Sequence, residues 1–382
     1  MNKSIHSNAK KVHINYLDGL RGIASFYVLL VHIDPSVGNK LPILLEIFTK
    51  LMRYGRVSVV FFIVLSGYVL MLPVVKSDGH ISGGLIGYIK RRSRRILPPF
   101  YASLLLCLLI ALIVFLLETF TSFRWNPVAG AGPFFPKFSA IDILTHILLI
   151  HNLSPDTYMS INPPMWTVAT EWQMYFIFPI LLVPIWRYFG LTLTVITAFL
   201  IGITPTYLLN GLFETASPWF LGLFALGIAA ADIGFSQKPK LIAIKKNLPW
   251  GLLAIIFTTI GFMTEWKYLN LHIWINESFF GMGAACLLIY CTEFSINSKK
   301  LPKLLQILEH PWSIALGGFS YSLYLTHGPI LVLMRYCLFY INMPPLMFGI
   351  MSYILGVAIS LITGYLFYLV FERPFISNIL KK

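Results

Sequence analysis

The chain of 382 residues is more apolar than soluble globular domains, with 57% hydrophobic residues, 12% charged residues and a mean hydropathy of +0.76. Its formal net charge of +14 alone would suit nucleic-acid binding. A soluble nucleic-acid-binding protein, however, does not carry repeated apolar runs of about 20 residues. We therefore expect an all-α integral membrane protein that does not bind nucleic acid, and we attribute its basic excess to membrane topology.

Taken in chain order, the apolar runs predict a polytopic helix bundle with about ten transmembrane helices. The runs of spanning or near-spanning length are residues 17–34, 57–75, 98–117, 165–186, 190–209, 217–234, 249–265, 272–291, 311–340 and 347–371. A weaker apolar stretch at residues 141–153 is too short to cross a membrane.

The connections between these runs alternate in charge. Lys and Arg concentrate in the tail of residues 1–16 and in every second connection after it, which predicts that both termini are cytoplasmic. The first outer loop departs from the rule, because it contains Lys40, Lys50, Arg53 and Arg56. Either this loop has a function, or the predicted boundary of the second span is misplaced.

We expect residues 1–382 to form a single membrane domain without an appended soluble domain. The apolar segment after residue 21 has no convincing cleavage pattern, so we interpret it as a retained first span and not a signal peptide. The cysteines all fall in predicted helices without CxxC spacing, which predicts apolar packing and neither disulfides nor a metal site. They are Cys107, Cys286, Cys291 and Cys337. His146 and His151 are also poorly spaced for ligating one metal ion from one helix.

The first span carries three ionisable residues within an apolar segment, Asp18, Arg21 and His32. Arg21 and His32 are eleven residues apart, so on a helix they lie within roughly 20° of one face and about 16 Å apart. Exposing this stripe to lipid would cost several kcal/mol, so we expect it to face a protein interior or a wet cavity. The alternative is an Asp18–Arg21 pair that anchors the helix at the interface, with His32 reaching the outer surface.

Two segments that follow combine small and basic residues. In the second span, Ser66 and Gly67 would let another backbone or a ligand approach closely. The cytoplasmic end of the third span then carries five cations in six residues, Lys90, Arg91, Arg92, Arg94 and Arg95. This run is explained either by topology, by anionic lipid headgroups or by a phosphorylated cytosolic ligand.

Later spans contain further ionisable residues. Glu171 lies in the first turns of a span that arrives from the outer side, where a carboxylate needs a partner or a chemical role. His327 precedes a Gly-Pro pair that can open the helix locally, and a structural hydrogen bond and a chemical role are both compatible with it. Glu372 and Arg373 at the end of the last span are expected to cap that helix.

Six motifs occur in one order from about residue 16 to residue 375. They are DGLRGIASFYVLLVH, FFIVLSGY, RRSRRILPPFY, MWTVATEWQMYFIFP, SYSLYLTHGPI and FERPF. This series resembles membrane acyltransferase family 3, which includes O-antigen and other surface-polysaccharide O-acetylases. The resemblance implies a bundle of about ten helices that moves an acyl group from cytosolic acyl-CoA to a hydroxyl of a sugar-containing acceptor.

The resemblance also implies roles for individual residues. It assigns the family's arginine and histidine to Arg21 and His32, and its glutamate to Glu171. His32 and Glu171 are therefore the expected catalytic residues, and Glu171 would orient an acceptor or a partner side chain. The family's basic motif corresponds to Arg91, Arg92, Arg94 and Arg95. Guanidinium groups are suited to the phosphates of acetyl-CoA, the implied acyl donor. His32 would act either as a general base or as an acylated nucleophile.

The resemblance implies a glycan or lipid-linked sugar acceptor, such as lipopolysaccharide O-antigen or exopolysaccharide, and a location among the lipids of a bacterial inner membrane. Peptidoglycan, an antibiotic and a signalling oligosaccharide remain alternative acceptors. A transporter or carrier of an anionic or acylated solute is the alternative from another class, because intramembrane charges alone do not distinguish transport from catalysis. The oligomeric state is left open.

Overall fold

The computed structural model describes residues 15–36 and 43–380, and within these ranges the secondary structure is entirely helical. The predicted all-α class is therefore confirmed for this part of the chain. Residues 1–14 of the predicted tail, and Lys40, lie outside the described residues. The α-helices are α1 (Asn15–Val31), α2 (Ile43–Leu51), α3 (Gly55–Lys76), α4 (Gly84–Phe120), α5 (Ala140–Ile147), α6 (Met165–Ile177), α7 (Val183–Phe189), α8 (Leu191–Leu208), α9 (Phe220–Phe235), α10 (Pro239–Asn247), α11 (Trp250–Thr264), α12 (Ile273–Ile296), α13 (Pro311–Gly318), α14 (Ser320–Phe339), α15 (Pro345–Phe367) and α16 (Arg373–Leu380).

Short 3₁₀ and π segments join several of these helices. The 3₁₀ segments are η1 (Met52–Tyr54), η2 (His151–Leu153), η4 (Glu214–Ala216), η5 (Lys267–Leu269) and η6 (Lys303–Glu309). The π segments are η3 (Phe178–Leu182), which contains a proline, and η7 (Tyr368–Glu372). In both places the helix runs on across the wider turn, so α6 continues into α7 and α15 into α16.

Within the described residues, seven helical segments are long and apolar enough to cross a membrane, or eight if the bent pair α10–α11 counts as one span. The sequence predicts about ten, and each of the ten predicted segments is helical. The difference comes from α1, which has 17 residues, from α11, and from α14, which carries His327 and Arg335. Length and apolar composition therefore support a polytopic bundle with fewer clear spans than predicted.

The second span begins earlier than predicted. The helical segment runs from Leu45 to Lys76, so Lys50, Arg53 and Arg56 belong to it and not to a free loop. Lys50 forms an ion pair with Glu46 at 2.8 Å, and Arg53 lies 4.8 Å from the centroid of the adjacent tyrosine ring. The misplaced boundary accounts for the unusual position of these basic residues.

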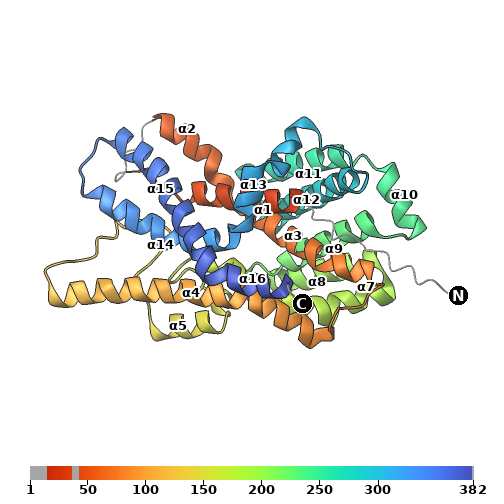
Figure 1. The fold of residues 1–382 in the computed structure, drawn as a ribbon, viewed down its shortest axis with the longest axis horizontal. Coiled ribbons are helices and arrows are strands. Elements are labelled where there is room, and N and C mark those ends of the chain that lie inside the picture. The colour runs from red at the N-terminus through yellow and green to blue at the C-terminus, as the bar shows by residue number, and fades with distance from the viewer. Residues whose placement is uncertain (1–14, 37–42, 381–382) are drawn as a thin grey trace.

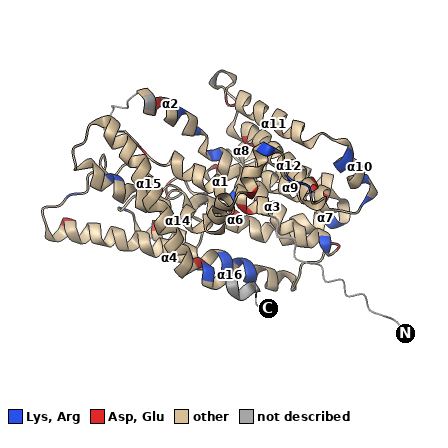
Figure 2. Cartoon of the chain, turned by 45° about the horizontal axis from the view of Figure 1, so that its top comes forward, with Lys and Arg blue, Asp and Glu red and all other residues tan. Residues whose placement is uncertain are grey.

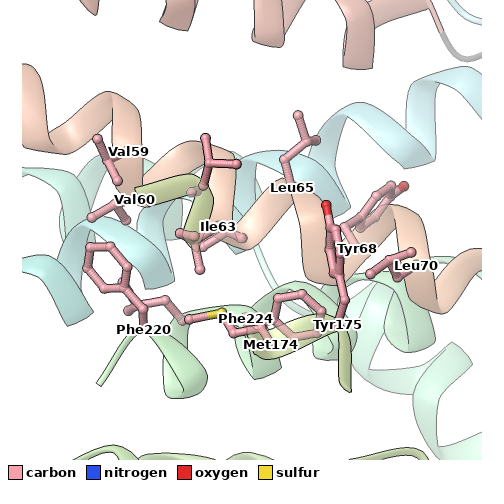
Figure 3. Close-up of a cluster of buried hydrophobic side chains, with 14 of the residues drawn as sticks. Val59, Val60, Ile63, Leu65, Tyr68, Leu70, Met174, Tyr175, Phe220 and Phe224 are labelled. Atoms are coloured by element: carbon pink, nitrogen blue, oxygen red, sulfur yellow. The ribbon is translucent and has the colours of Figure 1, made fainter. Parts of the chain in front are cut away.

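Helix α3 lies in the centre of the bundle, where its apolar side chains pack against α6 and α9 (Figure 3). A Cβ on Gly67 would lie 2.0 Å from the carbonyl oxygen of Phe224, and one on Gly227 would lie 1.9 Å from that of Val64. The missing side chains let the two backbones touch, which is the role of small residues in membrane helix packing. Gly67 thus serves helix packing and not ligand access.

The two ends of the bundle consist of different elements. Figure 1 shows the end of α4 together with α2 and the start of α15 on one side, and α7 and α10 on the other. A run of Lys and Arg on the first half of α4 lies beside α16 (Figure 2).

Of the four cysteines, three are buried as expected, whereas Cys337 is exposed on α14.

Candidate functional site

A cavity with about 850 Å³ of space, including its open mouth, lies between α1, α3, α4, α6 and α14. It is the place where five of the six sequence motifs meet. Its polar lining consists of Arg21, Ser66, Arg92, Arg95, Thr167, Glu171, Tyr175, Ser320, Tyr321 and Tyr324, and the remaining lining is aliphatic apart from Phe62. The structure therefore brings Arg21, Arg92, Arg95, Ser66 and Glu171 together around one space.

The basic run of α4 divides into two faces. Arg92 and Arg95 are three residues apart, so they lie on one face of the helix and both line the cavity. Arg91 instead donates a hydrogen bond to the carbonyl oxygen of Ser82 at 2.5 Å, and Arg94 is exposed. Only two of the four arginines that the resemblance treats alike can contact a molecule in the cavity.

Positive charge exceeds negative charge in the cavity lining. Arg21 donates to Asp18 at 3.1 Å, while Glu171 accepts hydrogen bonds from the hydroxyls of Ser66 and Tyr175, the latter at 2.5 Å. The Nε of Arg92 is buried and has no hydrogen-bond partner among the described residues. Because an unpaired buried donor is costly, these guanidinium groups are suited to an anion that accepts several hydrogen bonds.

His32 and His327 form a pair beyond the outer end of the cavity. The Nε2 of His327 lies 3.2 Å from the Nδ1 of His32, and the ring centroids are 4.9 Å apart. His327 is almost fully buried. The residues come from α14 and from the turn that follows α1, and the sequence alone does not indicate this contact.

Backbone carbonyls define the tautomers of this pair. The Nδ1 of His32 lies 2.9 Å from the carbonyl oxygen of Val28, and the Nδ1 of His327 lies 3.2 Å from that of Leu323. A carbonyl oxygen only accepts, so each Nδ1 carries the proton in the neutral ring. The Nε2 of His327 then accepts a second contact from the Nδ1–H of His32. The Nε2 of His32 is left as the basic nitrogen.

One layer of side chains joins the cavity to this pair. The hydroxyls of Tyr324 and Thr167, both in the cavity lining, lie 2.7 Å apart, and the Tyr324 ring centroid lies 5.7 Å from that of His327. His32 itself lines a smaller adjacent space on the outer side with Asp34 and Arg335. Tyr324 therefore lies between the histidine pair and the arginine-lined cavity, and the smaller space adjoins His32 on the outer side.

Arg335 fixes the backbone above the histidine pair. It is buried, it donates to the carbonyl oxygens of Val128 at 2.5 Å and of Ala129 at 2.7 Å, and it forms an ion pair with Asp34 at 3.3 Å. It also donates to the carbonyl oxygen of Ser36 at 2.8 Å. An intramembrane charge with this many partners holds two loops over His32.

Glu372 and Arg373 lie outside the cavity lining. The buried carboxylate of Glu372 accepts from the backbone N–H of Ser322 at 3.2 Å and from its hydroxyl at 2.5 Å. It therefore ties the end of α15 to the start of α14, next to the cavity residue Tyr321, while Arg373 is exposed. Glu372 of the FERPF motif thus holds the start of α14, which carries Tyr321, without lining the cavity itself.

His146 and His151 lie outside the spans and form a second histidine pair. His146 of α5 and His151 of η2 are buried, with ring planes 7° apart and centroids 3.7 Å apart. Burial lowers the pKa of both imidazoles. Among the described residues no group of three or more His, Cys, Asp or Glu side chains is arranged to hold a metal ion.

Sequence reasoning missed the tyrosines of the cavity. Tyr321 and Tyr324 are three residues apart on α14, and Tyr175 follows Glu171 by four residues on α6. Residues three or four apart lie on one face of a helix, so Tyr321 and Tyr324 share a face of α14, and Tyr175 shares a face of α6 with Glu171. Aromatic residues in a membrane helix are common in apolar packing. The spacing alone therefore did not distinguish these hydroxyls from core residues.

The fold and the site define an integral membrane protein with a basic cavity that opens within a helix bundle. The family described as an acyltransferase domain, acyltransferase family 3, matches residues 14–369. The chain belongs to this family, and it is a membrane acyltransferase. Comparisons with curated proteins and with solved structures find no match. The family match favours acyl transfer over the carrier hypothesis.

Proposed function

We propose that the protein transfers an acetyl or other short acyl group from cytosolic acyl-CoA to a hydroxyl of a surface glycan, such as lipopolysaccharide O-antigen or exopolysaccharide, in a bacterial inner membrane. The observation that carries the proposal is the cavity in which Arg21, Arg92 and Arg95 outnumber the one lining carboxylate, Glu171. This charge lies on the predicted cytoplasmic side of the His32–His327 pair, where a phosphorylated donor would enter.

The donor's chemistry matches the cavity. The phosphates of acyl-CoA accept several charge-assisted hydrogen bonds, and Arg92 offers a buried Nε without a protein partner. Arg21 and His32 are about 16 Å apart along α1, a distance that the pantetheine arm can span. In this arrangement the phosphates stay with the arginines, and the thioester extends past Thr167 and Tyr324 towards the histidines.

The tautomer of His32 is suited to general-base catalysis. Its unprotonated Nε2 accepts the proton of the acceptor hydroxyl while the hydroxyl oxygen attacks the thioester carbonyl carbon. The carbon–sulfur bond then breaks, and the CoA thiolate leaves and takes up a proton. His327 acts as a positioning residue, because its Nε2 accepts from the Nδ1–H of His32 and keeps the basic nitrogen turned away. The alternative, an acyl group carried on His32, uses the same nitrogen as the nucleophile.

Glu171 is proposed to support this chemistry from the cavity wall. Its carboxylate accepts from Ser66 and Tyr175, so it is engaged by two hydroxyls on α3 and α6. It balances part of the arginine charge and sets the width of the cavity between these two helices. In this role it positions the donor and does not exchange a proton with the acceptor.

The test is thiol release from acetyl-CoA by the purified full-length protein in lipid nanodiscs, measured together with acetyl-CoA binding. We expect wild type to release thiol and His32→Ala to bind acetyl-CoA without releasing it. Binding or movement of intact acetyl-CoA, without any thiol release by wild type, would support a carrier instead. An acyl group mapped to His32 by mass spectrometry after rapid denaturation at neutral pH would select the covalent route.

A further inference from the structure

A second hollow, which we call the outer pocket, lies on the side predicted to face away from the cytoplasm. It encloses about 970 Å³ including its open mouth, and it is separate from the arginine-lined cavity. Its walls come from the start of α3, the connection between η2 and α6, the η4 segment and the start of α12. Its lining includes Arg56, Tyr158, Trp166, Phe213, Glu214 and Trp219.

The charged groups of the outer pocket are paired. The Nε of Arg56 donates to the buried carboxylate of Glu277 at 2.6 Å, and the indole N–H of Trp219 donates to the same carboxylate at 2.6 Å. Glu214 at the mouth accepts from the Nε2 of His272 at 2.7 Å. Because the charge of Arg56 is already compensated, the pocket does not favour an anion.

Aromatic side chains form a large part of the wall of the outer pocket. The Arg56 guanidinium lies 5.4 Å from the ring centroid of Trp166, while Tyr158 and Phe213 form part of the wall. Flat aromatic surfaces beside a few fixed donors and acceptors are typical of small-molecule pockets. The C–H face of a sugar ring packs against such surfaces, while its hydroxyls reach the paired carboxylates and guanidinium.

The backbone of this wall is strained. Phe213 and Ser217, on either side of η4, have φ of +62° and +50°, in the left-handed region that residues other than glycine rarely adopt. Ser217 is buried and its hydroxyl accepts from the Nη2 of Arg56 at 3.3 Å. Strain of this kind persists where the surroundings hold it, and it clusters at binding sites.

The outer pocket borders the histidine pair along two helices. Gly55, next to Arg56, touches Val31, next to His32: a Cβ on Gly55 would lie 2.8 Å from the Val31 side chain. On α6, Trp166 lines the outer pocket and the following residue, Thr167, contacts Tyr324 beside His327. Residues that line the outer pocket are thus immediate sequence neighbours of residues that pack against the surroundings of the proposed catalytic pair.

We infer that the outer pocket is the binding site of the acceptor, and that it takes an uncharged, hydroxyl-rich pyranose residue of a glycan. The inference rests on the proposed function and adds the location and charge of the acceptor site. The donor enters the arginine-lined cavity, and the sugar enters from the opposite side. Their reacting groups meet at His32.

The experiment measures binding of three neutral trisaccharides, maltotriose, chitotriose and mannotriose, by saturation-transfer NMR with full-length protein in nanodiscs, because glycoside detergents would compete. We compare wild type with Tyr158→Ala and Glu214→Gln. Arg56 is left intact, since its removal would leave the buried Glu277 carboxylate unpaired. The matched control is Tyr268→Ala, which removes an exposed tyrosine from the α11–α12 connection outside the pocket.

We expect at least one trisaccharide to bind wild type and the control equally, and Tyr158→Ala to weaken binding by about fivefold. Absence of binding by all three, unchanged binding in both pocket variants, or displacement of the sugar by inorganic phosphate would each overturn the inference. Thiol release from acetyl-CoA is measured on the same samples with and without each trisaccharide. If wild type releases no thiol under either condition, the proposed function fails, while the sugar-binding result still decides whether the pocket is a glycan site.

Discussion

The arginine-lined cavity and the outer pocket share two helices, α3 and α6, but differ in electrostatics. In the cavity, α3 and α6 contribute Ser66 and Glu171, and the guanidinium groups around them exceed the carboxylates. In the outer pocket the same helices contribute Arg56 and Trp166, and the Arg56 charge is matched by a buried carboxylate. The comparison teaches that uncompensated charge, not the presence of arginine, distinguishes a proposed anion site from a proposed sugar site.

The largest effect is expected from a substitution of His32, which we place between the arginine-lined cavity and the outer pocket. His32→Ala removes the proposed base, and general-base catalysis contributes about 10²–10⁴-fold, so we expect acyl transfer to fall by about that factor. The affinities for acetyl-CoA and for the trisaccharide should both stay within about twofold of wild type, because His32 lines neither the arginine-lined cavity nor the outer pocket. Transfer activity near wild type in a folded variant would move the chemistry away from the histidine pair.

The next test separates the two faces of the basic run on α4. Arg92→Ala removes a cavity guanidinium, and because one charge-assisted hydrogen bond contributes about 1.5–3 kcal/mol, we expect the KM for acetyl-CoA to rise by about 10–100-fold. Arg94→Ala, which removes an exposed arginine from the same helix, is the matched control and should change KM by less than about threefold. Equal effects would indicate a general topology or lipid role for the run.

A smaller effect is expected from the second histidine. His327→Leu removes one of the two acceptors of the Nδ1–H of His32 and leaves the Val28 carbonyl, so we expect kcat to fall by about tenfold while both KM values stay unchanged. His327→Gln retains an acceptor at a similar distance and should restore most of the rate. If the glutamine variant is as slow as the leucine variant although both fold, His327 does not act by holding the tautomer of His32.

The smallest effect concerns pH and the outer pocket. Burial lowers the pKa of His146 and His151, so the native state excludes protons that the unfolded chain binds below about pH 6.5. The free energy of unfolding therefore has its full value above that pH and decreases as the pH drops further, by at most about 1.4 kcal/mol per pH unit for each histidine. η2 carries His151 and leads into the pocket wall at Leu153, so trisaccharide binding should weaken before acetyl-CoA binding does.

The measurement is the apparent Tm in nanodiscs at pH 7.5 and 5.5, with both ligands titrated at each pH. His151→Gln should reduce the difference in Tm between the two pH values. His80→Gln, which removes an exposed histidine, should leave that difference unchanged. A wild-type Tm that is equal at both pH values would contradict the expected cost of protonating the buried pair.

The sequence by itself determined the class of the protein, because a long apolar run satisfies its backbone hydrogen bonds locally and forms a helix whatever its neighbours are. It also predicted that Arg21 and His32 lie on one face of the first span, and His32 lies in the turn directly after α1. The motif order identified the family. Helix ends were less well determined: the second span begins about a dozen residues before the predicted start, because amphipathic residues continue the helix beyond its apolar core.

Only the tertiary structure decided which residues share a space. The approach of His327 to His32 joins residues 295 positions apart, and the division of Arg92 and Arg95 from Arg91 and Arg94 depends on which face of α4 the other helices cover. The outer pocket likewise requires the pairing of Arg56 with Glu277, 221 residues away. Contacts between helices are fixed by side-chain packing and charge compensation over the whole bundle, and local periodicity does not contain that information.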